Sequence, residues 1–288
     1  MNQATVKRQL YKRFLGPALG CILFFPPASA QTYHMMSWEE YSRNSYRWPY
    51  ILNIYVPNGG LLYFGVGHTD DPCDEQLKEI ETFWKQFDPD IAFYEGPELY
   101  AAENTRSDAI RNDGERGLVR YLAGSHLTVN SMEPKVGEEI AELLKKYRPE
   151  QVKIFYIMRD VAGYDRLKFP NQTRQQYLQD EIARWSAEAA LKNVPPNTIS
   201  ELEPTFAKYF PGLGSYKNAH DRWVDPASAE TLLNEISRAS TEYRDQFMVS
   251  LLSSTVCEHK RVLAVVGWSH VVRQEPAIRA LLSEKCSH

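Results

Sequence analysis

The stretch Leu61-Leu62-Tyr63-Phe64-Gly65-Val66-Gly67-His68 decides the fold expected for this chain of 288 residues. Its consecutive apolar residues predict a buried strand, and Gly65-x-x-His68 leads from that strand into a helix expected at 72–87. The same order recurs near the end of the chain, where the apolar run 262–266 leads into Gly267-Trp268-Ser269-His270 and a final helix. The two segments therefore predict parallel strands of one sheet, each followed by a helix.

The rest of the chain alternates short apolar runs with helical periodicity, apart from residues 31–48, which we expect to form an irregular arm. Further strands are expected at 50–56, 91–94, 127–129 and 152–158, and further helices at 115–122, 135–147, 174–191, 200–209 and 226–253. Strands that alternate with helices predict an α/β fold with a largely parallel or mixed central sheet flanked by helices. Because the block from about 170 to 253 contains only predicted helices, we expect a helical insertion or cap within a single domain at 31–288.

The first thirty residues have the three parts of a secretory signal peptide. Four cations precede an apolar run at 14–25, and Ala28-Ser29-Ala30 supplies an A-x-A cleavage site. The apolar run is much shorter than the ~20 residues that span a bilayer, and no transmembrane segment is predicted. We therefore expect an exported protein, periplasmic or secreted, that is cleaved near Ala30. A lipoprotein attached through Cys21 is the alternative, which is weakened because Ala18 stands where Leu is usual.

The expected mature chain is acidic. Removal of the four N-terminal cations changes the formal net charge from -4 to -8. Such a chain repels polyphosphate, so a small-molecule or peptide substrate is expected and nucleic acid is not. Three cysteines remain in an oxidising compartment. Because the strand–helix unit between Cys257 and Cys286 turns back on itself, we predict a disulfide between them and a free thiol at Cys73.

Two histidines and a glutamate form the candidate site. In an open α/β sheet, the loops after the carboxyl ends of the strands line one edge, where ligands bind. His68 and His270 are therefore expected to face one crevice, together with Glu95, which directly follows the strand at 91–94. One Gly-x-x-His motif alone is typical of a packed or loop histidine, and the repetition favours function. The glycines at the first motif positions are expected to allow a sharp turn.

Two imidazoles and a carboxylate suit two kinds of chemistry. They can hold a divalent metal with an open coordination position, as in catalytic zinc or manganese sites. They can also perform general acid–base catalysis without a metal. In both cases a neutral histidine is required, so activity is expected to fall on acidification through about pH 6.

Four segments together resemble a known superfamily: Gly65-Val66-Gly67-His68, Glu95, Tyr243-Arg244-Asp245-Gln246 and Gly267-Trp268-Ser269-His270. The pattern, over about 60–284, is similar to the superfamily of the TIKI/TraB-type proteins, the erythromycin-esterase-like enzymes and the ChaN-type haem-binding lipoproteins. The resemblance implies that His68 and His270 are metal ligands or catalytic bases, with Glu95 beside them. It implies that Arg244 holds an anionic intermediate or a substrate carboxylate. Trp268 and the helical block at 170–253 depart from the pattern of the superfamily.

Two further glutamates are candidates for the same edge of the sheet. Glu133 follows the predicted strand at 127–129 and is expected either at this edge or as a helix cap. Glu115 lies in Gly114-Glu115-Arg116-Gly117, which resembles a superfamily position near the site. The alternative for Glu115 is a solvated acid in a first helical turn.

Three other segments have a functional and a structural interpretation. Asp245 beside Arg244 is expected at the site, or as half of a surface charge pair. Trp268 is expected to stack on substrate, or to pack against the helix that follows. Arg159-Asp160 follows the predicted strand at 152–158 and is a further candidate for the edge.

The motifs of several common enzyme classes are missing from the sequence. There is no Walker loop, no Gly-x-Gly-x-x-Gly after a strand, no Gly-x-Ser-x-Gly and no His-Glu-x-x-His. We therefore predict an exported hydrolase that uses a divalent metal (zinc, manganese or cobalt) and cleaves an amide, peptide or ester bond. His68, Glu95 and His270 are the expected metal ligands, and Arg244 is expected to stabilise the oxyanion. The alternative is a haem- or metal-binding protein of the same fold without catalysis.

Overall fold

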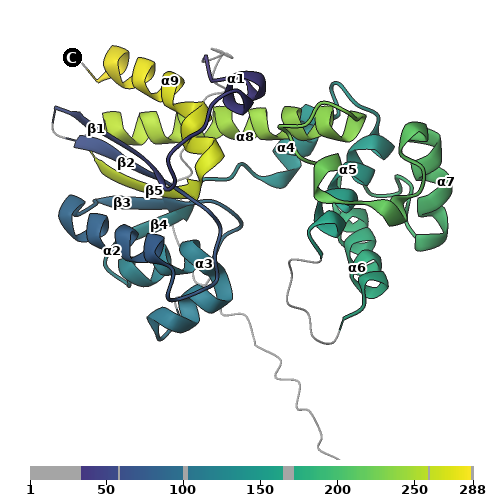
Figure 1. The fold of residues 1–288 in the computed structure, drawn as a ribbon, viewed down its shortest axis with the longest axis horizontal. Coiled ribbons are helices and arrows are strands. Elements are labelled where there is room, and N and C mark those ends of the chain that lie inside the picture. Colours follow the sequence, from purple (N-terminus) through teal and green to yellow (C-terminus); the bar gives the residue numbers. More distant parts are fainter. Residues whose placement is uncertain (1–33, 58, 100–102, 165–171, 259, 287–288) are drawn as a thin grey trace, which may run out of the picture. The chain divides into compact units, whose positions relative to one another are not determined.

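The computed structural model contains a five-stranded mixed sheet with helices on both of its faces (Figure 1). The structure describes residues 34–57, 59–99, 103–164, 172–258 and 260–286. The predicted signal peptide and Cys21 lie outside these residues. The sheet and its flanking helices confirm the predicted α/β fold.

The strands are β1 (Tyr50–Val56), β2 (Gly59–Val66), β3 (Ile91–Tyr94), β4 (Thr128–Ser131) and β5 (Arg261–Gly267), in the spatial order β1-β2-β5-β3-β4. β1 pairs antiparallel with β2, as the hairpin sequence predicts, and all the other pairs are parallel. The carboxyl ends of β2, β3, β4 and β5 therefore meet at one edge of the sheet. β2 and β5 are buried along nearly their whole length, which is typical of parallel strands covered on both faces.

The helices are α1 (Trp38–Ser42), α2 (Glu75–Phe87), α3 (Arg106–Ala123), α4 (Val136–Leu143), α5 (Pro149–Ala162), α6 (Arg174–Ala187), α7 (Ile199–Tyr209), α8 (Leu232–Cys257) and α9 (Trp268–Lys285). Successive residues of β2 point to opposite faces of the sheet. Tyr63 belongs to a hydrophobic cluster with residues of α8 and α9, whereas Leu62 and Phe64 belong to one with residues of α2 and α3. Figure 1 shows α8 and α9 on one face of the sheet and α2 and α3 on the other. Within the described residues, no helix is long and apolar enough to cross a membrane.

A third hydrophobic cluster is made of helices and the loops between them, without residues of the sheet. It joins α4, α5, α6, α7 and the start of α8, and it includes Phe155, Trp185 and Phe206. The cluster therefore begins before residue 170, where the sequence suggested that the helical block starts. The last turns of α8 pack instead against the sheet, so α8 connects the two parts of the core.

The predicted strand at 152–158 is wrong, because these residues form the middle of α5. A helix that is apolar around its whole circumference has no 3.6-residue pattern, and a short apolar run of this kind resembles a buried strand. Even Lys153 is fully buried, and its ammonium donates to Ser186 Oγ and to the carbonyl of Val194. Pro149 at the first helical position was the available signal for a helix.

The predicted disulfide is present, and it links the end of α8 to the end of α9. Cys257 and Cys286 are bonded with a Cα–Cα distance of 5.3 Å, and Cys73 is free and exposed. The bond closes a loop with a sequence separation of 29 residues, directly around β5 and α9. It therefore restrains the strand and helix that carry the second Gly-x-x-His motif.

Replacing both Cys257 and Cys286 with serine is expected to lower the free energy of unfolding by about 3–4 kcal/mol, because the loop is then open in the unfolded chain. Urea unfolding measures this, with Cys73→Ser as the matched control that changes stability by less than about 0.5 kcal/mol. Titration of the non-reduced mature protein should find the Cys73 thiol alone. Three reactive thiols would contradict the pairing.

Candidate functional site

Four acidic or basic side chains meet where the parallel strands end. His68 lies two residues after β2, Glu95 directly follows β3, Glu133 follows β4, and His270 is in the first turn of α9 after β5. The Nε2 atoms of both histidines face the same carboxylate. That of His270 lies 3.4 Å from Glu95 Oε1, and that of His68 lies 3.9 Å from Glu95 Oε2.

The exposed His68 pairs with the buried Glu115. Its Nδ1 lies 2.5 Å from Glu115 Oε1, while 64% of its side chain is exposed. The hydrogen bond to Glu115 raises the pKa of His68 above its ordinary value, against an opposing effect of burial. Because Nδ1 is held by Glu115, Nε2 is the atom that can exchange a proton with a bound molecule.

A kink in α3 brings Glu115 to this position. Gly114 has a φ of +60°, and a Cβ there would lie 2.8 Å from the carbonyl oxygen of Thr69. The second part of the helix therefore starts against the loop that carries His68, and the Thr69 N–H faces Glu115 Oε2 at 3.4 Å. The interpretation of Glu115 as a solvated acid is wrong, since the residue is buried.

Glu95 is the centre of the site. Its Oε2 accepts the backbone N–H of Gly267 at 2.7 Å, and its Oε1 accepts Nη2 of Arg244 at 2.9 Å. Burial alone would raise the pKa of Glu95, but the charges of His270 and Arg244 outweigh it and hold the pKa well below its usual value. Glu95 is therefore an ionised acceptor at neutral pH.

Arg244 joins Glu95 to Glu133. Its Nε donates to Glu133 Oε2 at 2.7 Å, and its Nη2 donates to Glu133 Oε1. The helix-cap interpretation of Glu133 is wrong, because the N-cap of α4 is Lys135. Arg244 lies near the middle of α8, so the same helix that connects the two parts of the core also supplies this cation.

His270 is held on both sides by carboxylates. Its Nδ1 lies 2.5 Å from Oδ1 of Asp245, and its Nε2 faces Glu95. Burial lowers the pKa of His270, but Glu95 and Asp245 outweigh this and raise it to about 10. His270 is therefore an imidazolium at neutral pH, in contrast to the exposed His68 with its single hydrogen-bonded carboxylate.

Asp245 is fully buried and has three hydrogen-bonding partners, so its interpretation as half of a surface pair is wrong. Besides His270, it accepts Nη1 of Arg273 and Nε2 of Gln274, the latter at 2.7 Å. Arg273 and Gln274 were not among the site residues predicted from the sequence. Their positions three and four residues after His270 place them on the same face of a helix, which was the available signal.

The first glycine of each motif lies where neighbouring atoms leave little room for a Cβ. Gly267 has φ −53° and ψ 133°, a conformation open to other residues, and neither it nor Gly65 has a positive φ. A Cβ on Gly267 would lie 3.2 Å from Glu95 Oε2 and 3.2 Å from His68 Nε2. A Cβ on Gly65 would lie 2.8 Å from the Cα of Trp268. The expected sharp turn is therefore not the reason for either glycine.

The remaining candidates lie outside this network. Trp268 packs against two aromatic rings of the N-terminal segment, with centroid distances of 5.6 Å to Tyr41 and 6.3 Å to Tyr46. Arg159 and Asp160 belong to the last turns of α5, where Asp160 accepts the indole N–H of Trp185 at 3.0 Å. Their assignment to the edge of the sheet depended on the wrong strand at 152–158.

Whether His68, Glu95 and His270 can bind a divalent metal depends on whether the oxygens of Glu95 are free to act as ligands. Imidazoles whose Nδ1 is hydrogen-bonded to a carboxylate, as in both histidines here, are common metal ligands. However, both oxygens of Glu95 already accept N–H groups, and one of these belongs to the cation of Arg244. Across the described ranges, no group of three or more His, Cys, Asp or Glu side chains is arranged to hold a metal ion. As placed, these residues do not fit the metal, whose presence stays a prediction.

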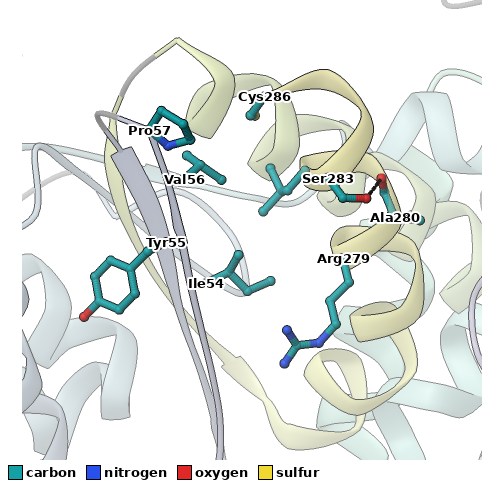
Figure 2. Close-up of a pocket in the computed structure, with 9 residues that line it drawn as sticks. Ile54, Tyr55, Val56, Pro57, Arg279, Ala280, Ser283 and Cys286 are labelled. Atoms are coloured by element: carbon teal, nitrogen blue, oxygen red, sulfur yellow. Dashed lines mark hydrogen bonds between the residues drawn. The ribbon is translucent and has the colours of Figure 1, made fainter. Parts of the chain in front are cut away.

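A surface depression of about 530 Å³ lies at the opposite end of the strands from this network. Ile54 and Val56 of β1 line one side, and Arg279 and Ser283 of α9 line the other (Figure 2). Val56 pairs with Gly59 at the start of β2, whereas His68 follows the end of β2. This depression is therefore separate from the site.

Comparison of the chain with family models, with curated proteins and with solved structures found no match. Membership of the superfamily with two Gly-x-x-His motifs stays a prediction from those motifs.

Proposed function

We propose that this chain is a hydrolase of ester or amide bonds and that His68 is its general base. The observation that carries the proposal is the pairing of Nδ1 of His68 with Glu115, which leaves Nε2 of this exposed side chain beside a buried network of charges. Nε2 accepts a proton from water as the water oxygen bonds to the substrate carbonyl carbon. The bond to the leaving group then breaks, and His68 returns the proton to the leaving oxygen or nitrogen.

Arg244 supplies positive charge for the oxyanion that forms. Its hydrogen bonds to Glu95 and Glu133 run through Nε and Nη2, and in the part of the chain that the structure describes Nη1 has no hydrogen-bond acceptor. A cation fixed in this way needs no reorganisation when charge develops on the carbonyl oxygen. His270, protonated between two carboxylates, holds the network together and is not the base.

We also propose that the protein is exported and belongs to the superfamily whose motifs it resembles. The bond between Cys257 and Cys286 supports export, because structural disulfides persist in oxidising compartments. The superfamily includes esterases that work without a metal. This supports a base supplied by the protein itself.

Haem binding is the second candidate. The side chain of His68 is exposed, so its imidazole could bind the iron of a haem, and Glu115 would orient it as carboxylates orient other iron-binding imidazoles. A Soret shift that is lost in His68→Ala would support this candidate, provided that the protein hydrolyses none of the esters below.

The test uses the mature chain from Gln31, dialysed against chelator and analysed for bound metal. Hydrolysis of methyl esters and primary amides is measured near pH 8. We expect turnover to survive metal removal and to fall by at least about 10³-fold in His68→Ala, because the base is gone. His126→Ala, at an exposed histidine, is the control. If turnover is lost when the metal is removed and returns when one equivalent of metal is added back, the metal-dependent prediction is correct.

A further inference from the structure

A tryptophan beside the proposed base is exposed to solvent. Among the described residues, the large hydrophobic side chains with high exposure are Trp48, Tyr55 and Val136, and Trp48 is 49% exposed. Trp48 lies just before β1, in the segment that the sequence analysis treated as an irregular arm. Its indole lies against the loop that carries His68.

The contact between Trp48 and this loop passes through Gly67. A Cβ at Gly67 would lie 2.8 Å from Nε1 of Trp48 and 2.9 Å from its Cζ2, so the indole occupies the space where a side chain would be. Gly67 directly precedes His68. The indole is therefore within a few ångströms of the backbone of the proposed base.

The backbone under the indole is fixed. The N–H of Gly67 donates to Oε1 of Gln76 at 3.0 Å, and its carbonyl accepts Nε2 of Gln76 at 2.7 Å. Gln76 is itself buried at the start of α2. These two hydrogen bonds hold the backbone on both sides of Gly67, which is the surface that the indole contacts.

Within residues 34–48, the other aromatic rings are partly buried. Tyr41 stacks on Tyr46 with a centroid distance of 5.4 Å, and both contact Trp268, two residues before His270. The segment is thus attached to the second histidine loop through Trp268 and to the first through Gly67. Trp48 is the ring of this group that has a large free surface.

We propose that Trp48 is the substrate-binding platform of the site and that the substrate is an ester or amide with an aromatic ring a few bonds from its carbonyl. Two aromatic rings stack with centroids 4.5–7 Å apart, which suits a ring on the indole and a carbonyl at Nε2 of His68. The cation of Arg273 is already paired with Asp245, and that of Arg244 is assigned to the oxyanion, so a neutral ring fits better than a second anionic group. This inference rests on the proposed hydrolase function.

The test compares three methyl esters that share one leaving group: methyl 3-phenylpropanoate, methyl 3-cyclohexylpropanoate and methyl propanoate. Each is cleaved to its acid and methanol. We expect kcat/KM for the phenyl ester to exceed that of the other two by about tenfold, because only the phenyl ring is flat. The advantage should appear in KM, since Trp48 touches no reacting atom.

Trp48→Ala is expected to lower this preference at least fivefold, and Trp48→Phe should keep most of it. Tyr55→Ala is the matched control, because Tyr55 is an exposed aromatic residue at the other end of β1. Equal kcat/KM for the phenyl and cyclohexyl esters would overturn the proposal. An unchanged preference in Trp48→Ala would overturn it as well, and would leave the hydrolase function intact.

If no ester is cleaved, a binding measurement tests the Trp48 platform independently of the hydrolase function. The neutral amide 3-phenylpropanamide is titrated into wild type and Trp48→Ala, with saturation-transfer NMR on the phenyl protons. Weaker binding to Trp48→Ala by about tenfold would support the platform even where the hydrolase proposal fails. Equal binding to both proteins would overturn the platform.

Discussion

Glu115→Gln is expected to lower kcat by about 10²–10⁴-fold on any ester that the protein hydrolyses. When His68 takes a proton from water its ring becomes an imidazolium, and the carboxylate 2.5 Å from Nδ1 stabilises that charge. Glutamine has nearly the same size but no charge, so it loses this stabilisation without leaving a cavity. Steady-state kinetics with methyl 3-phenylpropanoate measures the effect. Glu103→Gln, at an exposed acid that accepts from Asn112, is the control.

The same substitution should move the pH profile. The base must be neutral, so kcat/KM rises as the pH passes upward through the pKa of His68. The hydrogen bond to Glu115 raises this pKa above 6.5, and the wild-type rise should therefore lie above pH 6.5. The sequence alone placed it near pH 6, because an ordinary histidine was assumed. In Glu115→Gln the rise should lie at lower pH. If the rate and its pH dependence both stay unchanged, Glu115 does not act on the base.

The edge of the sheet that carries the site was predictable from the chain order. Apolar runs followed by Gly65-x-x-His68 and Gly267-x-x-His270 indicated parallel strands, and parallel strands with helical connections place their carboxyl ends together. β5 lies between β2 and β3, so both histidine loops and Glu95 come from neighbouring strands. This arrangement follows from topology and does not depend on side-chain detail.

The pairing of the acidic residues was not predictable in the same way. Glu115, Glu133 and Asp245 were all candidates, but each comes from a different helix or loop, and periodicity carries no information about the contacts between them. The kink at Gly114 decides that Glu115 meets His68, and the packing of α8 on α9 decides that Asp245 meets His270. Tertiary packing therefore makes His68 an exposed base and His270 a buried imidazolium.

The predicted strand at 152–158 and the missed Trp48 have related causes. The structure of each segment is decided by the residues that it packs against. An apolar run such as 152–158 is compatible with a buried helix or a buried strand. The aromatic segment at 34–48 has no period at all. Its position follows from contacts with α9, where Nε of Arg273 donates to the carbonyl of Met36 at 3.1 Å and its guanidinium lies 4.1 Å from the ring centroid of Trp38.

Asp245→Asn is expected to lower the free energy of unfolding at pH 7 by about 3–5 kcal/mol. Asp245 is fully buried, and its carboxylate is the anion that faces Arg273 and Nδ1 of His270. Asparagine has the same shape but no charge, so the guanidinium of Arg273 is left buried without its anion. Urea unfolding gives the difference. Glu230→Gln, in an exposed ion pair with Arg222, should cost less than about 1 kcal/mol.

The pH dependence of stability distinguishes this charge network from ordinary packing. The pKa of His270 is raised to about 10 in the folded protein, against about 6.5 for an ordinary histidine. Because the folded state holds this proton more tightly, its contribution to stability is fully present below about pH 6.5 and is lost as the pH rises towards 10. Asp245→Asn removes one of the two carboxylates that raise the pKa, so the loss should end at a lower pH and be smaller. The stability of wild type and of the control variant Glu230→Gln is measured over this pH range. If neither changes between pH 6.5 and 10, His270 is not a buried imidazolium.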